Sequence, residues 1–240
     1  YFYNNQLCPP YPDCISEEDI GYQDTSECEE SSLCDEGYTE IDGECYYQSD
    51  LDVLQQFINN SQEGFMPPSY DMSPIDLGVQ EWENGRIVFL CYSYIGESEC
   101  YIYDYILSGE IPSDIGNLVE LRNLILTWSE LNGEIPPSIV NLTNLTELKL
   151  HYNQLTGEIP IGLGNMTNLT DLYLRENQLT GEIPTDIWGL VNLNRLFLEY
   201  NELNGEIPET FGDLVNLSYC NLKHNQFSGQ IPESIGNFEN

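Results

Sequence analysis

Hydrophobic positions in the second half of the chain recur with a fixed period of 24 residues. Within one unit, Leu172 and Leu174 alternate about Tyr173, which predicts a short strand with one buried face. The same leucine column reads Leu126, Leu150, Leu174, Leu198 and Leu222, and GEIP or GQIP begins at Gly109, Gly133, Gly157, Gly181, Gly205 and Gly229. Because one coil cannot bury its own leucines, the period predicts a stack of coils that share one core.

A polar column follows each predicted strand, at the point where the chain must turn. Its members are Ser129, Asn153, Asn177, Asn201 and Asn225. A side-chain amide at a turn can satisfy backbone groups of neighbouring turns. We therefore predict a ladder of asparagine side chains along the stack.

These residues resemble the leucine-rich repeat family, in particular its 24-residue plant-type class with the pattern LxxLxLxxNxLxGxIPxxLGxLxx. The resemblance covers residues 107–240, as five full repeats and a partial sixth. It implies an α/β solenoid, a right-handed superhelix with a parallel β-sheet on its concave face and a second short sheet at the LxGxIP segments. Relatives of the plant type are often receptor ectodomains or inhibitors of secreted enzymes.

Two further regions precede the repeats. Residues 49–106 are expected to form the N-terminal cap of the solenoid, with a helix over 51–58 capped by Ser49 or Asp50 and a first strand at Ile87–Leu90. An insert that contains Cys91 and Cys100 is expected between this strand and the repeats. Residues 1–48 lie outside the repeat and form an acidic, cysteine-rich appendage. Within it, CDEGYTEIDGEC at 34–45 resembles the closing half of an EGF-like module, although the CxC of that module is missing.

Seven of the eight cysteines precede the repeats, at Cys8, Cys14, Cys28, Cys34, Cys45, Cys91 and Cys100. This clustering predicts disulfides in an oxidising, extracellular compartment, with Cys91 and Cys100 paired and at least one other left without an obvious partner. Zinc is the alternative, but there are no CxxC pairs and no histidine nearby. The eighth, Cys220, replaces a strand leucine and is expected to be a buried core residue.

The composition excludes several partners. With 41 acidic residues against six Lys or Arg, the formal charge is −35, which argues against nucleic acid and against an anionic membrane surface. No run of 18 apolar residues is present to insert into a membrane. The chain begins at Tyr1 without a basic and apolar leader, so we expect any signal peptide to have been removed.

The few basic residues gather around the strand leucines. Five variable positions per repeat (122, 123, 125, 127 and 128 in the first) should face the concave side, and these 25 positions hold five of the six Lys and Arg, both histidines and four acidic residues. The formal charge is therefore about +1 there and about −36 elsewhere. The predicted binding residues are Arg122, Trp128, Lys149, His151, Tyr152, Tyr173, Arg175, Arg195, Phe197, Tyr200, Lys223 and His224, with Tyr219 beside them.

Aromatic and arginine enrichment is typical of binding hot spots. The alternative is that these cations only offset repulsion between neighbouring strands. A binding face of this kind implies a partner that presents carboxylates: an acidic protein surface, an acidic polysaccharide or another copy of the chain. A second copy is attractive because residues 1–85 contain 20 Asp or Glu and no Lys or Arg.

The pattern favours a secreted, non-enzymatic interaction module over an enzyme. No carboxylate pair or nucleophile stands out, no cofactor or metal site is indicated, and His151 and His224 should lie roughly 14 Å apart. The sixth repeat stops before its strand, which favours a cell-surface or extracellular assembly or adhesion component, including a self-assembling filament subunit. The alternative is a receptor-type ectodomain or enzyme inhibitor that recognises a soluble peptide, a protein or an acidic polysaccharide.

Six Asn-x-Ser/Thr sequons are candidates for glycosylation in a eukaryotic secretory pathway. Because the LTNLT consensus of the repeat creates most of them, their number alone is weak support. They lie at Asn59, Asn141, Asn144, Asn165, Asn168 and Asn216.

Overall fold

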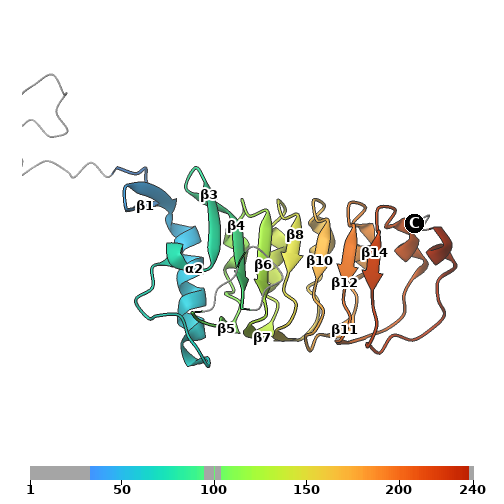
Figure 1. Ribbon diagram of the computed structural model, residues 1–240. Coiled ribbons are helices and arrows are strands. Elements are labelled where there is room, and N and C mark those ends of the chain that lie inside the picture. Colours follow the sequence, from blue (N-terminus) through green and yellow to red (C-terminus); the bar gives the residue numbers. More distant parts are fainter. Residues whose placement is uncertain (1–32, 95–99, 101–103, 238–240) are drawn as a thin grey trace, which may run out of the picture.

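The computed structural model describes residues 33–94, Cys100 and residues 104–237, which form a stack of coils (Figure 1). Seven strands make the main sheet, in the order β14-β12-β10-β8-β6-β4-β3. They are β3 Val79–Glu83, β4 Arg86–Ser93, β6 Asn123–Thr127, β8 Glu147–Lys149, β10 Asp171–Tyr173, β12 Arg195–Phe197 and β14 Tyr219–Asn221. All neighbours pair in parallel except β3 and β4, which are antiparallel. The predicted solenoid with a parallel sheet is confirmed.

The register of the sheet aligns equivalent leucines of successive repeats. Leu148 stands opposite Leu172, and Leu172 opposite Leu196, and all three are fully buried. The next leucine of each strand, such as Leu174, is buried as well. The leucines form one continuous core that runs through the described coils, so each repeat is stabilised mainly by burial against its neighbours.

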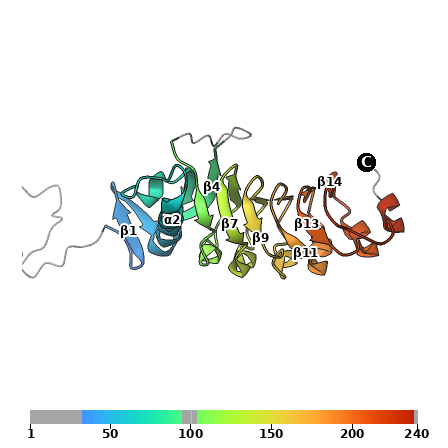
Figure 2. The ribbon, with the colours of Figure 1, turned by 90° about the horizontal axis from the view of Figure 1, so that it is seen from below.

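Short strands on the other side of each coil form the second sheets (Figure 2). A three-stranded sheet contains β5 Ser108–Glu110, β7 Glu130–Glu134 and β9 Gln154–Thr156, and a two-stranded sheet contains β11 Thr180–Glu182 and β13 Glu202–Asn204. Gly157 shows why GEIP needs its glycine: its φ is +74°, and a Cβ there would lie 2.7 Å from Cγ of Glu134.

Short 3-10 helices complete the coils on the convex side. In the solenoid they are Ile115–Asn117, Pro137–Asn141, Leu163–Asn165, Thr185–Gly189, Glu209–Asp213 and Glu233–Asn237. Two more, Ser61–Glu63 and Pro74–Asp76, lie in the N-terminal cap.

The predicted asparagine ladder is confirmed. The side-chain amide of Asn177 donates to the carbonyls of Leu150, one coil earlier, and Leu174, at 3.0 and 3.1 Å. Its oxygen accepts from the backbone N–H of Leu155 at 3.0 Å. Asn153, Asn201 and Asn225 make the equivalent bonds. The ladder satisfies buried backbone groups where the strands end.

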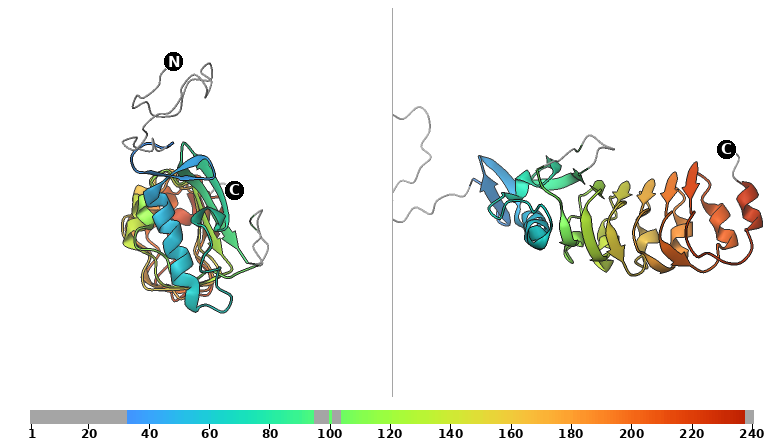
Figure 3. Two further views of the ribbon diagram at one scale, coloured as in Figure 1. Left: turned by 90° about the vertical axis from the view of Figure 1, so that its left-hand side faces the viewer. Right: turned by 60° about the horizontal axis from the view of Figure 1, so that its bottom comes forward.

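The helix α2 (Gln48–Asn60) covers the N-terminal end of the core, as the end-on view shows (Figure 3). The expected caps are wrong: α2 begins after Tyr47 with no side-chain cap. Asp50 is instead wholly buried. Its carboxylate accepts hydrogen bonds from Nε and Nη2 of Arg86 at 2.9 and 3.0 Å and from the backbone N–H of Ile87 at 3.0 Å, and these bonds compensate for its burial. This ion pair joins the helix to β4.

A small hairpin precedes the helix, formed by β1 Tyr38–Ile41 and β2 Glu44–Tyr47. The disulfide Cys34–Cys45 staples it, and its Tyr46 ring packs edge-on against Trp82 of β3 at 4.8 Å between centroids. The predicted disulfide residues Cys8, Cys14 and Cys28 lie outside the described residues.

Candidate binding face

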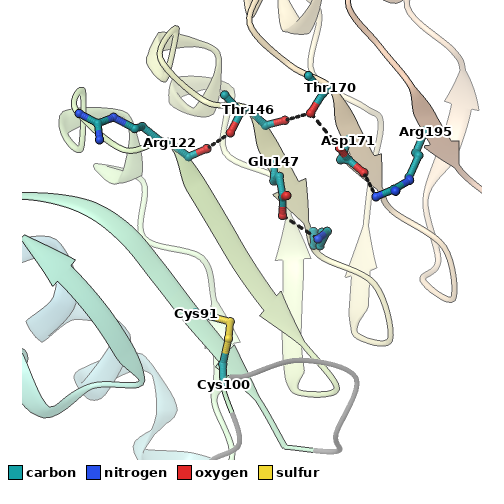
Figure 4. Close-up of polar contacts among 9 residues, drawn as sticks. Cys91, Cys100, Arg122, Thr146, Glu147, Thr170, Asp171 and Arg195 are labelled. Atoms are coloured by element: carbon teal, nitrogen blue, oxygen red, sulfur yellow. Dashed lines mark hydrogen bonds and ion pairs between the residues drawn. A yellow bond between two sulfur atoms is a disulfide. The ribbon is translucent and has the colours of Figure 1, made fainter. Parts of the chain in front are cut away.

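The side of the main sheet that faces away from the leucine core carries the predicted binding residues, and we name it the concave face. Most of its cations are already paired. Arg195 contacts Asp171 at 3.0 Å (Figure 4). Lys149 contacts Glu147 at 2.6 Å, and Arg175 contacts Glu199 at 3.5 Å. Arg122 pairs with Glu83, where both side chains are half exposed. Much of the positive charge therefore balances carboxylates of the sheet itself, as the alternative interpretation proposed.

Lys223 differs from these four cations. Within the described part of the chain it has no ion pair, and it is exposed just after β14. It is the basic side chain best placed to meet an acidic group of a partner.

Aromatic rings form a continuous band across the middle of the concave face. Trp128 stacks on Tyr152 with 3.7 Å between ring centroids, and Tyr173 lies 4.7 Å from Phe197. His151 bridges the two pairs, at 5.6 Å from Tyr152 and 5.6 Å from Tyr173. The band runs from β6 to β12, and its four larger rings are half-buried. The rings therefore bury much of their apolar area against one another.

Cations sit against this band. The guanidinium of Arg175 lies 5.2 Å from the Tyr152 ring centroid and 5.8 Å from that of Phe197. The ammonium of Lys149 lies 5.3 Å from the Tyr173 ring centroid. Each of these two residues thus interacts with both a carboxylate and a ring, which fixes it in the face.

The backbone conformation just after the strands positions one column of large side chains on the concave face. Trp128, Tyr152 and Tyr200 adopt a left-handed conformation, with φ of +51°, +56° and +57°, just before the ladder position. The amide of Tyr152 donates to the carbonyl of Arg175 in the next coil at 3.2 Å, and the others make equivalent bonds. The sequence pattern did not reveal this turn, which directs a column of large side chains to the rim of the sheet.

His151 is not accessible, so its prediction as an exposed contact residue is wrong. Its side chain is 4% exposed beneath the aromatic band. Burial, followed by the nearby charges of Arg175 and Lys149, lowers the pKa of His151 to about 3. The imidazole is therefore neutral at ordinary pH and adds no positive charge to the face.

The N-terminal end of the concave face is covered by the Cys91–Cys100 disulfide, which confirms the predicted pair. Cys91 stands in register with Ile125, in the concave column that continues through Lys149. The sequence predicted this pair in an insert between the first strand and the repeats. The position was open to inference, because aligning Leu90 with Leu124 puts the next residue, Cys91, on the concave side.

The C-terminal end of the face is open. Arg195, Lys223 and His224 are exposed, and Tyr200 and Tyr219 keep 48% and 60% of their area accessible. Tyr200 stacks on His224 with 4.3 Å between ring centroids. Apart from Arg122, which is exposed beside β6, exposure of the predicted binding residues thus rises toward β14.

Cys220 occupies the strand-leucine column, opposite Leu196, as predicted, but its expected burial is wrong. No described strand lies beyond β14, so Cys220 borders a hollow of about 560 Å³ with Phe211, Leu222 and Phe227. Partial burial in this hollow, with the carboxylate of Glu199, raises the pKa of the thiol to about 12.

The six sequon asparagines are all exposed. Three of them also serve the fold: Asn144, Asn168 and Asn216 donate to carbonyls of the preceding coil at 2.9, 2.8 and 2.7 Å. Glycosylation at these sites remains a prediction.

Two observations on the described residues bear on other chemistry. Among the described residues, no group of three or more His, Cys, Asp or Glu is placed to hold a metal ion. In the same part of the chain, no helix has the length and apolarity needed to cross a bilayer.

Comparison with known proteins agrees with this geometry. Two sequence models of the leucine rich repeat family match, at residues 143–203 and 216–238. No curated protein sequence matches the chain.

Solved plant structures share the fold. A plant ice-binding protein is 31% identical, with a TM-score of 0.67, over 81% of this chain and 61% of its own. A plant peptide hormone receptor, RGFR1 in complex with RGF2, is 39% identical with a TM-score of 0.54, over 55% of this chain and 21% of its own.

The ectodomain of the receptor kinase SOBIR1 from Arabidopsis thaliana adds support for the fold alone, at 24% identity and a TM-score of 0.59 over 77% of this chain and 98% of its own. The chain therefore spans about a fifth of the hormone receptor and three fifths of the ice-binding protein. Repeat period, register, asparagine ladder and these matches together identify the chain as a plant-type leucine-rich repeat protein.

Proposed function

We propose that the chain is an extracellular recognition module that binds an extended peptide or protein segment across the open, C-terminal part of the concave face. The observation that carries the proposal is the exposed group formed by Arg195, Tyr200, Tyr219, Lys223 and His224 at the end of a half-buried aromatic band. Exposed tyrosine and arginine side chains on a rigid sheet provide contact area at low entropic cost.

The comparisons support binding rather than catalysis. Neighbouring structures include a plant peptide hormone receptor, RGFR1, in complex with RGF2. The disulfides Cys34–Cys45 and Cys91–Cys100 support an extracellular or cell-surface location.

The partner that fits has a carboxylate and an apolar or aromatic side chain close together. Lys223 supplies a cation that no described carboxylate neutralises, whereas Lys149 and Arg175 are held by Glu147 and Glu199. An acidic polysaccharide or the acidic N-terminal region of a second copy would offer the same charge. A second copy in this role would give the filament or adhesive assembly that the charge asymmetry of the sequence favours.

The test is a selection of random-sequence peptides displayed on phage against the purified chain, with heparin binding and sedimentation of the chain alone as parallel measurements. Peptides that bind the wild type and lose binding in Lys223→Glu support the proposal. Heparin binding that is lost in the same variant would move the assignment to a polysaccharide, and salt-sensitive dimers or polymers would move it to self-assembly. A monomer that selects no peptide and binds no heparin contradicts a binding role for this face.

The test uses Lys223→Glu because other reversals are confounded. Replacing Lys149 or Arg175 by Glu would place a like charge beside Glu147 or Glu199 in a half-buried site, and a loss of binding there would also report misfolding. Lys223 is exposed and free of such a neighbour among the described ion pairs.

Adsorption to ice is a second candidate, favoured by the match to the plant ice-binding structure and by a regular surface on the convex side. Its exposed column reads Val119, Thr143, Thr167, Val191 and Val215, one residue per coil. Hydrogen bonds hold the column rigid; for example, the side-chain amide of Asn144 donates to the carbonyl of Val119 at 2.9 Å.

Inhibition of ice recrystallisation by the wild type, lost in Thr143→Lys/Thr167→Lys, would support this function. Equal growth of ice crystals with the chain and with serum albumin would contradict it.

A further inference from the structure

The Cys91–Cys100 disulfide forms a separate apolar cluster on the concave face. Cys91 and Cys100 are 0% and 2% exposed, Ile125 beside them is 7% exposed, and Phe89 packs against the group. The cluster is distinct from the leucine core on the other side of the sheet. The disulfide therefore covers the sheet from the side where a partner would approach.

The column that contains Cys91 shows where this cover ends. Pairing in register carries the column from Cys91 and Ile125 through Lys149, Tyr173, Phe197 and Asn221. The first two positions are buried and the other four are partly exposed. Since all six positions have the same place in the repeat, the disulfide and its neighbours account for the difference.

A purely stabilising role explains this placement less well. The two cysteines are nine residues apart, and closing so short a loop removes less chain entropy from the unfolded state than closing a long one. The stability that such a disulfide contributes does not depend on its lying over the variable column of the concave face.

We propose that the Cys91–Cys100 disulfide is a specificity-determining wall, which closes the concave face at β4 and β6 and confines a partner to the strands from β8 onward. The proposal rests on the binding function proposed above. The partner is an extended segment of peptide or protein that ends at the disulfide on this side, rather than a chain that also lies across β4 and β6.

The wall is tested without a partner, by carbene footprinting of the intact chain with a photoactivated diazirine that labels accessible side chains. We expect Ile125 to be labelled several-fold less than Asn221, which has the same place in the repeat. Removing the disulfide in Cys91→Ala/Cys100→Ala should raise labelling of Ile125 several-fold. The matched control, Cys34→Ala/Cys45→Ala, removes a disulfide outside the sheet and should leave Ile125 protected. Ile125 labelled as strongly as Asn221 in the wild type, or unchanged when the disulfide is removed, would overturn the wall.

Labelling of Leu148, which is fully buried, reports whether each variant has kept its core. If Leu148 is labelled in the disulfide-free variant, that variant has unfolded. The melting temperatures of Ile125→Asp and Asn221→Asp are then measured alongside the wild-type footprint. A wall predicts that Ile125→Asp lowers the melting temperature by several degrees and Asn221→Asp by far less; equal effects would contradict it. Footprints as expected together with a failed peptide selection would remove the binding proposal and, with it, the specificity role, and would leave the disulfide only as a cover of the sheet. Peptides that bind together with an accessible Ile125 would remove the wall alone.

Discussion

The two ends of the concave face share one backbone and one register but differ in what they offer to a partner. At the N-terminal end, Cys91 and Ile125 are buried under a disulfide, and Trp128 is stacked on Tyr152. At the C-terminal end, Tyr219 and Lys223 are exposed. The repeat decides where a side chain stands, whereas its neighbours decide whether it is available.

The same contrast applies to charge. Arg86 forms a pair with the fully buried Asp50 at the N-terminal end, and this pair joins the cap helix to the sheet. In the middle, Arg175 and Lys149 are paired and packed on rings. Only toward β14 does a described cation, Lys223, stand without a carboxylate. A net positive count on a face is therefore a poor measure of the charge that a ligand meets.

The largest expected effect is at the closed end. Asp50→Ala should lower the free energy of unfolding by about 3–5 kcal/mol, because it leaves the partly buried guanidinium of Arg86 without its partner. Urea denaturation followed by circular dichroism measures the loss. Glu83→Ala breaks the exposed pair with Arg122 and is the control, with an expected cost of about 0–1 kcal/mol. Equal costs for the two variants would remove the distinction between buried and surface pairs.

The leucine column gives the next test, since Leu148 and Cys220 have the same place in their repeats. Leu148→Ala should cost about 2–5 kcal/mol, because it opens a cavity in a closed core. Cys220→Ala should change stability by less than about 0.5 kcal/mol, because its side chain borders an open hollow. Denaturation midpoints compare the two variants, and a large cost for Cys220→Ala would show that the end coil is closed.

His151 predicts a pH dependence of stability. Its folded pKa of about 3 lies below the ordinary value of 6.5, so the unfolded chain binds the proton first as the pH falls. The contribution of neutral His151 to the free energy of unfolding is therefore fully present above about pH 6.5. It is lost as the pH falls from about 6.5 to 3, and the loss is on the order of a few kcal/mol.

The variant His151→Gln cannot titrate and isolates this effect from the many carboxylates. The difference in unfolding free energy between wild type and variant should shrink, or change sign, as the pH is lowered from 7 toward 4. A difference that stays constant over this interval would show that His151 is solvated in the folded state.

Much of the fold followed from the sequence because the repeat is redundant. Leu172, Asn177 and Gly157 each recur in a column, so strand, turn and return segment were predictable together. The interactions that decide the site have no such redundancy. Asp50 looked like a helix cap but is buried by Arg86, which lies 36 residues later. Cys91 looked like part of an insert because only pairing with β6 places it on the face.

Burial on the concave face was harder to predict than position. The sequence placed His151 and Tyr200 in adjacent columns and predicted both as exposed contact residues. His151 is instead buried within the aromatic band, whereas Tyr200 is exposed. That outcome depends on contacts between repeats, such as the stacking of Trp128 on Tyr152, and these contacts come from the variable residues. The period carries no information about them.

We expect the open end of the concave face to bind a partner and the closed end not to bind one. The most direct measurement is the dissociation constant of a selected peptide for wild type, for Tyr219→Ser/Lys223→Glu at the open end and for Arg122→Glu at the closed end. We expect the affinity of the first variant to be weaker by on the order of tenfold or more, which corresponds to the loss of one hot-spot contact, and that of the second to be unchanged. Equal losses in both variants, or a loss in Arg122→Glu alone, would contradict it.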